Sequence, residues 1–480
     1  MTTSKGSRTV RETTRDASLR GVALALVIGG MAPLFSTTIV AIGLHTLQTE
    51  LDVQVGQVHW VSTSYLLALA AAVPIMAWGE RRFGARRLWI SALAIFLAGS
   101  VICALAWNLT SLVAGRVVQG VGGGLILPLM MSILVQSARG QDLGRLAAAV
   151  ALPTAAGPIL GPVLGGIILT WLSWRWMFLI AVPFCLVGGA VAFRLLPPDE
   201  PAPHPPRFDH LGFWLLAPAF AGLLLALSNT RHSGGLDRVD VLAPGLGGIA
   251  LVAAFVVWAW RRESKALVNV RLFVRPGFAR TSAVMFCIGI AMFGALFMLP
   301  LFFQGVLGKD PLTAGLYLIP QGIGSLSSRP AAIALTDRWR GNRVIAVGFA
   351  VLLISTLPFA FADAGTSRGW LVVVLFVRGL GLGAVLMPAM AIAYAGLEKA
   401  DVPHATVIMR IAQQVGGAFG TALLALVLSA AGAATRDPAT VTSAFHTGFW
   451  WASGLTAGAL VLSLFLPAVK LADVGTGSRG

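Results

Sequence analysis

Apolar stretches long enough to cross a bilayer recur along the whole chain, and they constrain the fold more than any other feature. About 20 consecutive apolar residues in a helix span the hydrocarbon core of a membrane. Hydrophobic residues make up 57% of the 480 residues and charged residues only 11%, whereas roughly a quarter of the residues of a soluble protein are charged. The sequence therefore predicts an all-α integral membrane protein.

We predict fourteen transmembrane helices. They cover residues 20–44, 58–78, 88–107, 110–135, 146–170, 174–195, 211–228, 241–260, 281–303, 314–335, 344–362, 370–395, 405–430 and 446–468. Two long loops flank helices 7 and 8, so the chain divides as six, two and six. The predicted parts are an N-terminal tail (1–19), a six-helix half (20–195), a linker region with two inserted helices (196–280), a second six-helix half (281–468) and a C-terminal tail (469–480).

The basic residues support this topology. The net charge is +16, which alone is compatible with nucleic-acid binding. With both termini in the cytoplasm, however, 25 of the 35 Lys and Arg residues lie on the cytoplasmic side and six in outer loops, as the positive-inside rule requires. The other four lie within predicted spans: Arg116, Arg329, Arg378 and Arg410. We therefore interpret the charge as a topology signal and expect no nucleic-acid partner.

An internal repeat relates the two six-helix halves. Residues 74–87 and 330–343 place proline, arginine, an aromatic residue and arginine at identical spacing in equivalent loops. Residues 116–128, an arginine followed by GVGGG and a proline, are echoed by residues 378–388 with GLGLG. Two related halves with a site between them at the middle of the membrane are typical of transporters.

The segment PTAAGPILGPVLGG, residues 153–166, combines glycines with prolines inside a predicted span. Gly157, Gly161 and Gly165 share one helix face, so a neighbouring helix can approach closely. Pro158 and Pro162 each remove a helical hydrogen bond and bend the helix. A static packing face would need only the glycines, so the prolines favour a contact that bends or parts.

These segments resemble the major facilitator superfamily, and within it the fourteen-helix drug:proton antiporters. The resemblance covers nearly the whole chain and rests on TTIVAIGLHTL, QVHWVSTSYLLALAAAVP, the loop 79–87, GRVVQGVGGG, GPILGPVLGG with SWRWMFLIAVP, and RIAQQVGGAFGTAL. It implies a major facilitator fold, alternating access, and export of small amphipathic or antibiotic-like compounds without a cofactor or a metal ion.

The resemblance also assigns roles to residues. The antiporter motif that seals the two halves corresponds to Gly157, Pro158, Gly161, Pro162, Gly165 and Gly166. The cytoplasmic latch loops correspond to Arg82, Gly84, Arg86 and Arg87, with Asp337 and Arg338 in the second copy. The usual acid of the first loop is replaced by Arg81. Plain topology-setting charge is the alternative interpretation of these loops.

Helix 1 shows the largest departure from the family pattern. Such antiporters commonly carry an aspartate at the position of Ser36, and none of the 19 acidic residues lies in the interior of a predicted span. A carboxylate-coupled exporter of cations needs a buried acid. We therefore expect a neutral or anionic substrate. The resemblance implies proton coupling, which would run through a histidine, a water network at an arginine or the substrate itself. His45 is the one histidine near the right place, although an interfacial residue without a role is the simpler interpretation.

Polar side chains within predicted spans usually face the interior of a helix bundle. The predicted residues of the substrate cavity and of coupling are Arg116, Gln119, Ser36, Thr37, Tyr65, Gln321, Arg410 and Gln413. Hydrogen bonding between helices is the alternative role for them, and an arginine reaching outward to the interface is the alternative for Arg116.

Other functions fit the sequence less well. The seven histidines are scattered and no phosphate-binding GxxxxGK[ST] pattern occurs, which disfavours a membrane enzyme and an ATP-driven pump. Cys103, Cys185 and Cys287 lie in apolar segments without paired spacing, so we expect no metal site and no disulfide. An exporter or facilitator of one endogenous neutral or anionic metabolite remains the alternative. We expect a monomer in the cytoplasmic membrane whose partners are lipid and a small molecule.

Overall fold

The structure is a computed structural model. It describes residues 4–138, 157, 160–196, 199, 208–229, 238–262, 266, 268–395, 397, 401–433, 435 and 437–468. Within these residues every regular element is a helix. The first half contains α1 (Ser4–Glu50), α2 (Val55–Val58), α3 (Trp60–Phe83), α4 (Ala85–Ala104), α5 (Leu109–Ala138), a helix over Leu160–Trp171, α7 (Trp176–Leu179) and α8 (Ala181–Leu195).

The rest of the described chain is also helical. It contains α9 (His210–Asn229), α10 (Val239–Arg262), the 3₁₀ helix η2 (Val270–Val274), α11 (Pro276–Gly305), α12 (Pro311–Trp339), α13 (Gly341–Thr356), the 3₁₀ helix η3 (Leu357–Phe361), α14 (Arg368–Tyr394), α15 (Val402–Ala430) and α16 (Pro438–Leu464). The all-α prediction is thus confirmed for the part of the chain that the structure describes.

Twelve helices of the described chain are long and apolar enough to cross a membrane, and each overlaps a predicted span. The predicted spans 146–170 and 314–335 have no such match, each for a different reason. The helix α12 has 29 residues, but hydroxyl side chains, Gln321 and Arg329 lower its hydropathy. The predicted span 146–170 lies partly outside the described residues, which include its helix Leu160–Trp171.

The two halves pack in the same way. In the first half α5 lies against α3 and α4, and in the second half α14 lies against α12 and α13. Gly84 links α3 to α4 with φ 88°, and Arg340 links α12 to α13 with φ 72°. Both residues have a positive φ. They occupy equivalent positions of the repeated loops, because each lies ten residues after the shared proline. The backbone thus repeats along with the sequence.

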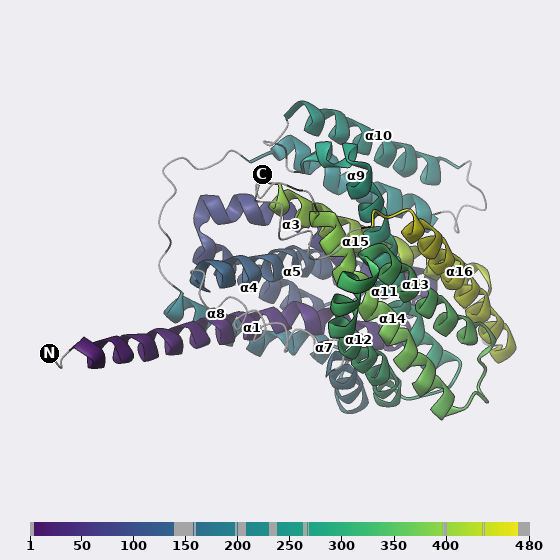
Figure 1. Cartoon of the computed structure of the whole chain (residues 1–480). Coiled ribbons are helices and arrows are strands. Elements are labelled where there is room, and N and C mark those ends of the chain that lie inside the picture. The colour runs from purple at the N-terminus through teal and green to yellow at the C-terminus, as the bar shows by residue number, and fades with distance from the viewer. Residues whose placement is uncertain are drawn as a thin grey trace.

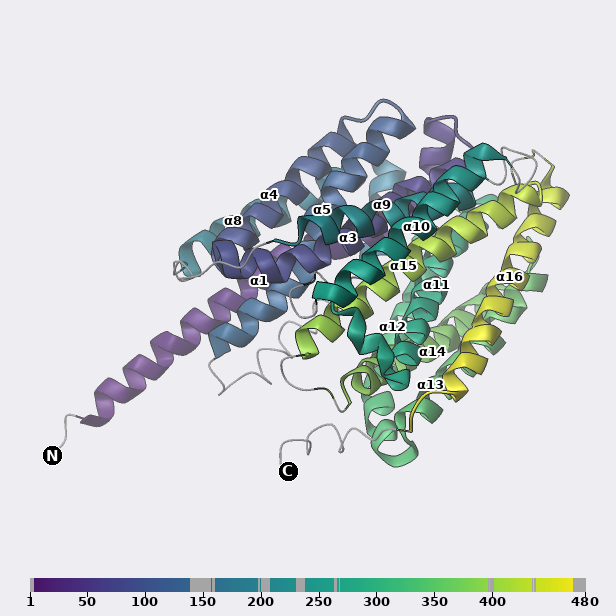
Figure 2. The ribbon, with the colours of Figure 1, turned by 90° about the horizontal axis from the view of Figure 1, so that it is seen from above.

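The halves lie side by side and approach each other at the end of the molecule away from the termini (Figure 2). At that end, the Gln304 amide of α11 donates a hydrogen bond of 2.9 Å to the carbonyl oxygen of Ile42 in α1. The buried apolar residues of both halves form one continuous cluster there, including Val58 and Phe302. We call this closed end the far end.

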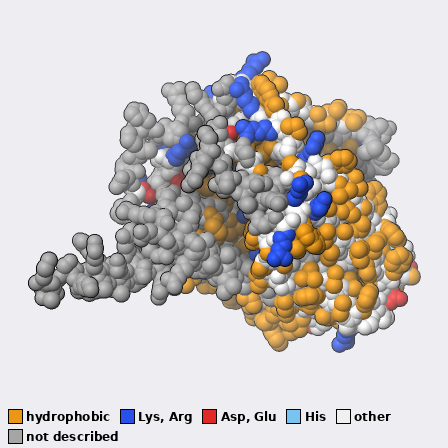
Figure 3. Space-filling model, viewed as in Figure 1, with side chains coloured by type: hydrophobic (Ala, Val, Ile, Leu, Met, Phe, Trp, Pro, Cys, Tyr) orange, Lys and Arg blue, Asp and Glu red, His pale blue; other side chains and the backbone are white. Residues whose placement is uncertain are grey.

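The pair α9 and α10 lies outside the two halves. The two helices pack against each other, and α9 contacts α3 of the first half and α15 of the second (Figure 1). On the face shown in Figure 3, a broad apolar surface covers the C-terminal half, and Lys and Arg side chains line one of its borders. A surface of this size without charge matches a bilayer better than water.

Candidate substrate cavity and gating contacts

Arg116 of α5 is the centre of a buried polar cluster in the first half. Its side chain is 1% exposed. The guanidinium donates from Nη1 to Ser36 Oγ at 2.8 Å and to Gln119 Oε1 at 2.5 Å, and from Nε to the Val61 carbonyl at 2.8 Å. Its Cζ lies 4.0 Å from the centre of the Tyr65 ring, a cation–π contact that stabilises a buried cation.

Ser36 of α1, at the position of the aspartate in the family pattern, contacts Arg116. Its hydroxyl accepts from Arg116 and donates to Gln119 Oε1 at 3.2 Å, and Gln119 in turn donates to Ser100 Oγ at 2.7 Å. All partners of the Arg116 cation in this network are neutral. Among the described residues, Asp209 is the one buried acid, and it precedes α9 rather than lying inside a helix.

A small cavity lies between the two halves beside Arg116. Thr37, Tyr65 and Arg116 line it from the first half, and Phe293, Phe297 and Thr421 are among its lining residues from the second. Its volume of about 10 Å³ is at the lower limit for one water molecule. The site between the halves is therefore closed to a drug-sized compound in this structure, and the Phe293 and Phe297 rings of α11 are among its lining residues.

The sequence-predicted cavity residues fall into separate groups. Arg116, Gln119, Ser36, Thr37 and Tyr65 come together as described. Three others lie elsewhere: Gln321 accepts a hydrogen bond of 3.1 Å from Arg378, Gln413 donates to Met292 Sδ at 3.9 Å, and the Arg410 side chain is exposed. The repeat explains the position of Gln321, because it corresponds to Tyr65: each lies nine residues before the shared proline, and each contacts the arginine of its own half.

The glycine face of the antiporter motif packs against α1. A Cβ on Gly157 or Gly165 would lie 3.2 Å from Leu34 Cβ or from Ile39 Cα, and one on Gly161 would collide with the Thr38 hydroxyl. These three contacts lie within the first half, whereas Pro162 and Gly166 of the same predicted motif meet the second half. A helix presents residues four apart to the same neighbour, and that neighbour is α1.

A different face of the same helix meets the second half. A Cβ on Gly166 would lie 2.5 Å from Leu312 Cα of α12, and one on Gly315 of α12 would collide with the carbonyl of Pro162. The backbones of the two halves are therefore in close contact at the far end. Pro158 of the predicted motif lies outside the described residues.

The first latch loop is held by a residue that sequence reasoning missed. The Asp199 carboxylate accepts hydrogen bonds from the backbone N–H groups of Arg86 at 2.9 Å and Arg87 at 2.8 Å. It thereby caps the N-terminus of α4, where negative charge is stabilised. The Arg86 guanidinium also donates to the Phe193 carbonyl and lies 4.7 Å from the Phe193 ring. No local signal could have found Asp199, since it lies 113 residues from Arg86 along the chain.

The other latch residues lie near the ends of helices. Arg82 and Arg338 are exposed at the ends of α3 and α12, and Asp337 lies in the last turn of α12. Next to Arg81, the Glu80 carboxylate accepts a hydrogen bond of 2.6 Å from the Ser132 hydroxyl of α5. Acids therefore do contribute to this loop region, at positions other than 81.

Two repeated helical halves, a closed polar site between them and an apolar exterior define a membrane transporter of small molecules. The sequence matches the family model described as "Major Facilitator Superfamily" over residues 24–421. The chain therefore belongs to the Major Facilitator Superfamily, and it is a transporter rather than an enzyme.

Individual relatives agree with this assignment. The chain is 34% identical over 417 residues to the "Multidrug resistance protein B homolog" of Mycobacterium tuberculosis, covering 86% of this chain and 77% of that one. It is 28% identical over 460 residues to the "Lincomycin resistance protein LmrB" of Listeria monocytogenes, covering 93% and 96%. The crystal structure of a peptide transporter, POT, superposes with a TM-score of 0.67 at 16% identity over 96% of each chain, which shows a shared fold.

Proposed function

We propose that this protein exports small amphipathic, drug-like compounds across the cytoplasmic membrane, and that these compounds are neutral or anionic. The observation that carries the proposal is Arg116, which is buried beside the cavity between the halves with Ser36 in place of an acid. The names of the relatives, which include multidrug and lincomycin resistance proteins, support efflux as the direction of transport.

Transport would proceed by alternating access of residues 20–195 against residues 281–468. In the proposed topology the chain has fourteen helices arranged as six, two and six, with both termini in the cytoplasm. The far end then faces outward and is closed by the contacts of Gly166 and Gln304. Both of these contacts join neutral groups. The inserted α9 contacts both halves, at α3 and at α15. Neither the fold nor the cavity needs a second copy, so we expect a functional monomer.

The electrostatics of the site select against cations. A cationic drug entering the cavity would meet the Arg116 guanidinium without a carboxylate to balance it, and like charges repel strongly where the dielectric constant is low. A neutral compound can accept a hydrogen bond from Arg116 and pack against Tyr65, Phe293 and Phe297. An anionic compound gains the charge interaction in addition. Proton coupling would then use the substrate itself or water held by Arg116.

Uptake into everted membrane vesicles, in which an exporter carries its substrate from the medium into the lumen, tests this proposal. Three fluorescent compounds of similar size, one cationic, one neutral and one anionic, are compared with and without an uncoupler. We expect transport of the neutral and anionic compounds, loss of transport in Arg116→Ala, and a loss on uncoupling if protons drive it. Transport restricted to the cation, or unchanged transport and unchanged gradient dependence in Arg116→Ala, would contradict the proposal.

A further inference from the structure

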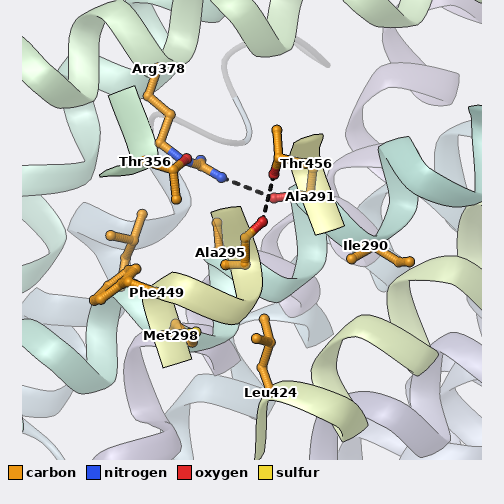
Figure 4. Close-up of a pocket in the computed structure, with 11 residues that line it drawn as sticks. Ile290, Ala291, Ala295, Met298, Thr356, Arg378, Leu424, Phe449 and Thr456 are labelled. Carbon is orange, nitrogen blue, oxygen red and sulfur yellow. Dashed lines mark hydrogen bonds between the residues drawn. The ribbon is translucent and has the colours of Figure 1, made fainter. Parts of the chain in front are cut away.

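A second enclosed cavity lies beside Arg378, inside the C-terminal half and separate from the cavity at Arg116. Its volume is about 20 Å³, which is room for one particle of the size of a water molecule. Helices α11, α13, α14, α15 and α16 all contribute lining residues. The polar groups at this cavity are the Arg378 guanidinium, the hydroxyls of Thr356 and Thr456, and the Ala291 carbonyl, and the rest of the wall is apolar (Figure 4).

The positive charge of Arg378 is not balanced by any described acid. The side chain is 4% exposed. It donates to Thr356 Oγ1 at 3.4 Å, Gln321 Oε1 at 3.1 Å and the Ala291 carbonyl at 3.1 Å, and the ion pairs within 4 Å in the described chain involve other residues. These bonds use three of the five N–H donors of a guanidinium. A buried cation without a counter-charge is costly, so the site favours an anion.

Arg116, the counterpart of Arg378 in the repeat, makes shorter hydrogen bonds and a cation–π contact. Its three hydrogen bonds measure 2.5–2.8 Å, and the Tyr65 ring covers it at 4.0 Å. The bonds of Arg378 are longer, and among the described aromatic rings none is stacked on its guanidinium. The two halves therefore bury equivalent arginines, but the protein stabilises the charge of Arg116 better than that of Arg378.

We propose that the cavity beside Arg378 binds a small monovalent anion, chloride in the cell. Arg378 supplies the charge and its two remaining N–H donors. The Thr356 and Thr456 hydroxyls now donate to carbonyls of their own helices, at 2.6 Å to Leu352 and 2.8 Å to Ala452. Because a hydroxyl hydrogen rotates to suit its partner, each of these hydroxyls can donate to an anion in the cavity instead. Because the helices of the C-terminal half meet at this point, the bound anion stabilises that half as a unit.

Thermal unfolding of the purified full-length protein tests the site. Sodium chloride is replaced by sodium gluconate at constant ionic strength, since gluconate is far too large for the cavity. We expect the unfolding temperature to rise with the logarithm of the chloride or bromide concentration once this exceeds the dissociation constant, and to stay flat with gluconate. Arg378→Gln abolishes this dependence. The matched control Arg116→Gln retains it, because that arginine belongs to the other half.

Two further measurements keep the test decisive if Arg378→Gln does not fold. Thr456→Val removes one donor and should raise the dissociation constant for chloride by about tenfold, as expected for a hydrogen bond to a charged group. Crystals grown with bromide should show an anomalous scattering peak beside Arg378. Equal unfolding temperatures in chloride and gluconate would mean that the cavity holds only water. A chloride dependence that survives in Arg378→Gln or is unchanged in Thr456→Val would place the anion elsewhere.

Discussion

Replacement of Gly84 by alanine should destabilise the first half through two separate effects. Gly84 has φ 88°, and a residue with a Cβ loses about 1–2 kcal/mol in the left-handed region. The new Cβ would also collide with the Asp199 carboxylate, which caps α4 through two backbone N–H groups. Hydrogen bonds to a charged group contribute about 1.5–3 kcal/mol each, and the half-buried position of Asp199 favours the lower value. Two hydrogen bonds at the lower value contribute about 3 kcal/mol, and the left-handed conformation adds about 1–2 kcal/mol, so we expect a total loss of about 4–5 kcal/mol.

The assay is the midpoint of thermal unfolding of the detergent-purified protein, combined with Asp199→Ala and the double variant. Asp199→Ala should lose only the capping part. The double variant should lose less than the two single variants together, because the collision no longer exists once the carboxylate is gone. Arg340→Gly, at the equivalent position with φ 72°, should be slightly stabilising, since relief of strain exceeds the entropy that glycine adds to the unfolded chain. Wild-type stability of Gly84→Ala, or strictly additive losses, would refute the reasoning.

Three other changes test the contacts of the halves and the Arg116 site. Gly166→Leu should lower efflux by preventing closure of the far end, because even a Cβ at this position would lie 2.5 Å from Leu312 Cα of α12. Gly161→Leu should lower the unfolding temperature because its side chain would overlap α1, whereas Gly454→Leu, at a glycine with open space around it, should behave as wild type in the same assay. Arg116→Lys should lose most efflux although the charge is kept, because a lysine cannot reach the three acceptors of the arginine together.

Much of the fold follows from the sequence because a bilayer imposes strong rules on it. Runs of apolar residues predict the spans, and the repeated spacing of residues 74–87 and 330–343 predicts two equivalent halves. The predicted span 314–335 is less apolar than the others, since polar side chains of α12 lie within the bundle, where Gln321 meets Arg378. The pairing of Ser36 with Arg116 was within reach of sequence reasoning, because the family pattern marks both positions.

Contacts between distant segments were not predictable in the same way. The glycines of residues 157–165 predict that another helix packs closely against them, but they do not identify that helix. In the structure it is α1 rather than a helix of the second half. Asp199 lies in a proline-rich segment, and its role depends on how the chain returns to α4. The cavity at Arg378 exists only because helices from across the C-terminal half meet there.

The most direct test of the central claim is to restore the acid that Ser36 replaces. In Ser36→Asp the carboxylate would lie where the hydroxyl now accepts a 2.8 Å hydrogen bond from Arg116, and it would neutralise that cation. We predict that wild-type vesicles export the anionic and neutral compounds, and that Ser36→Asp loses anion export while cation export appears or rises. An unchanged preference for charge in Ser36→Asp, at equal protein levels, would contradict the account.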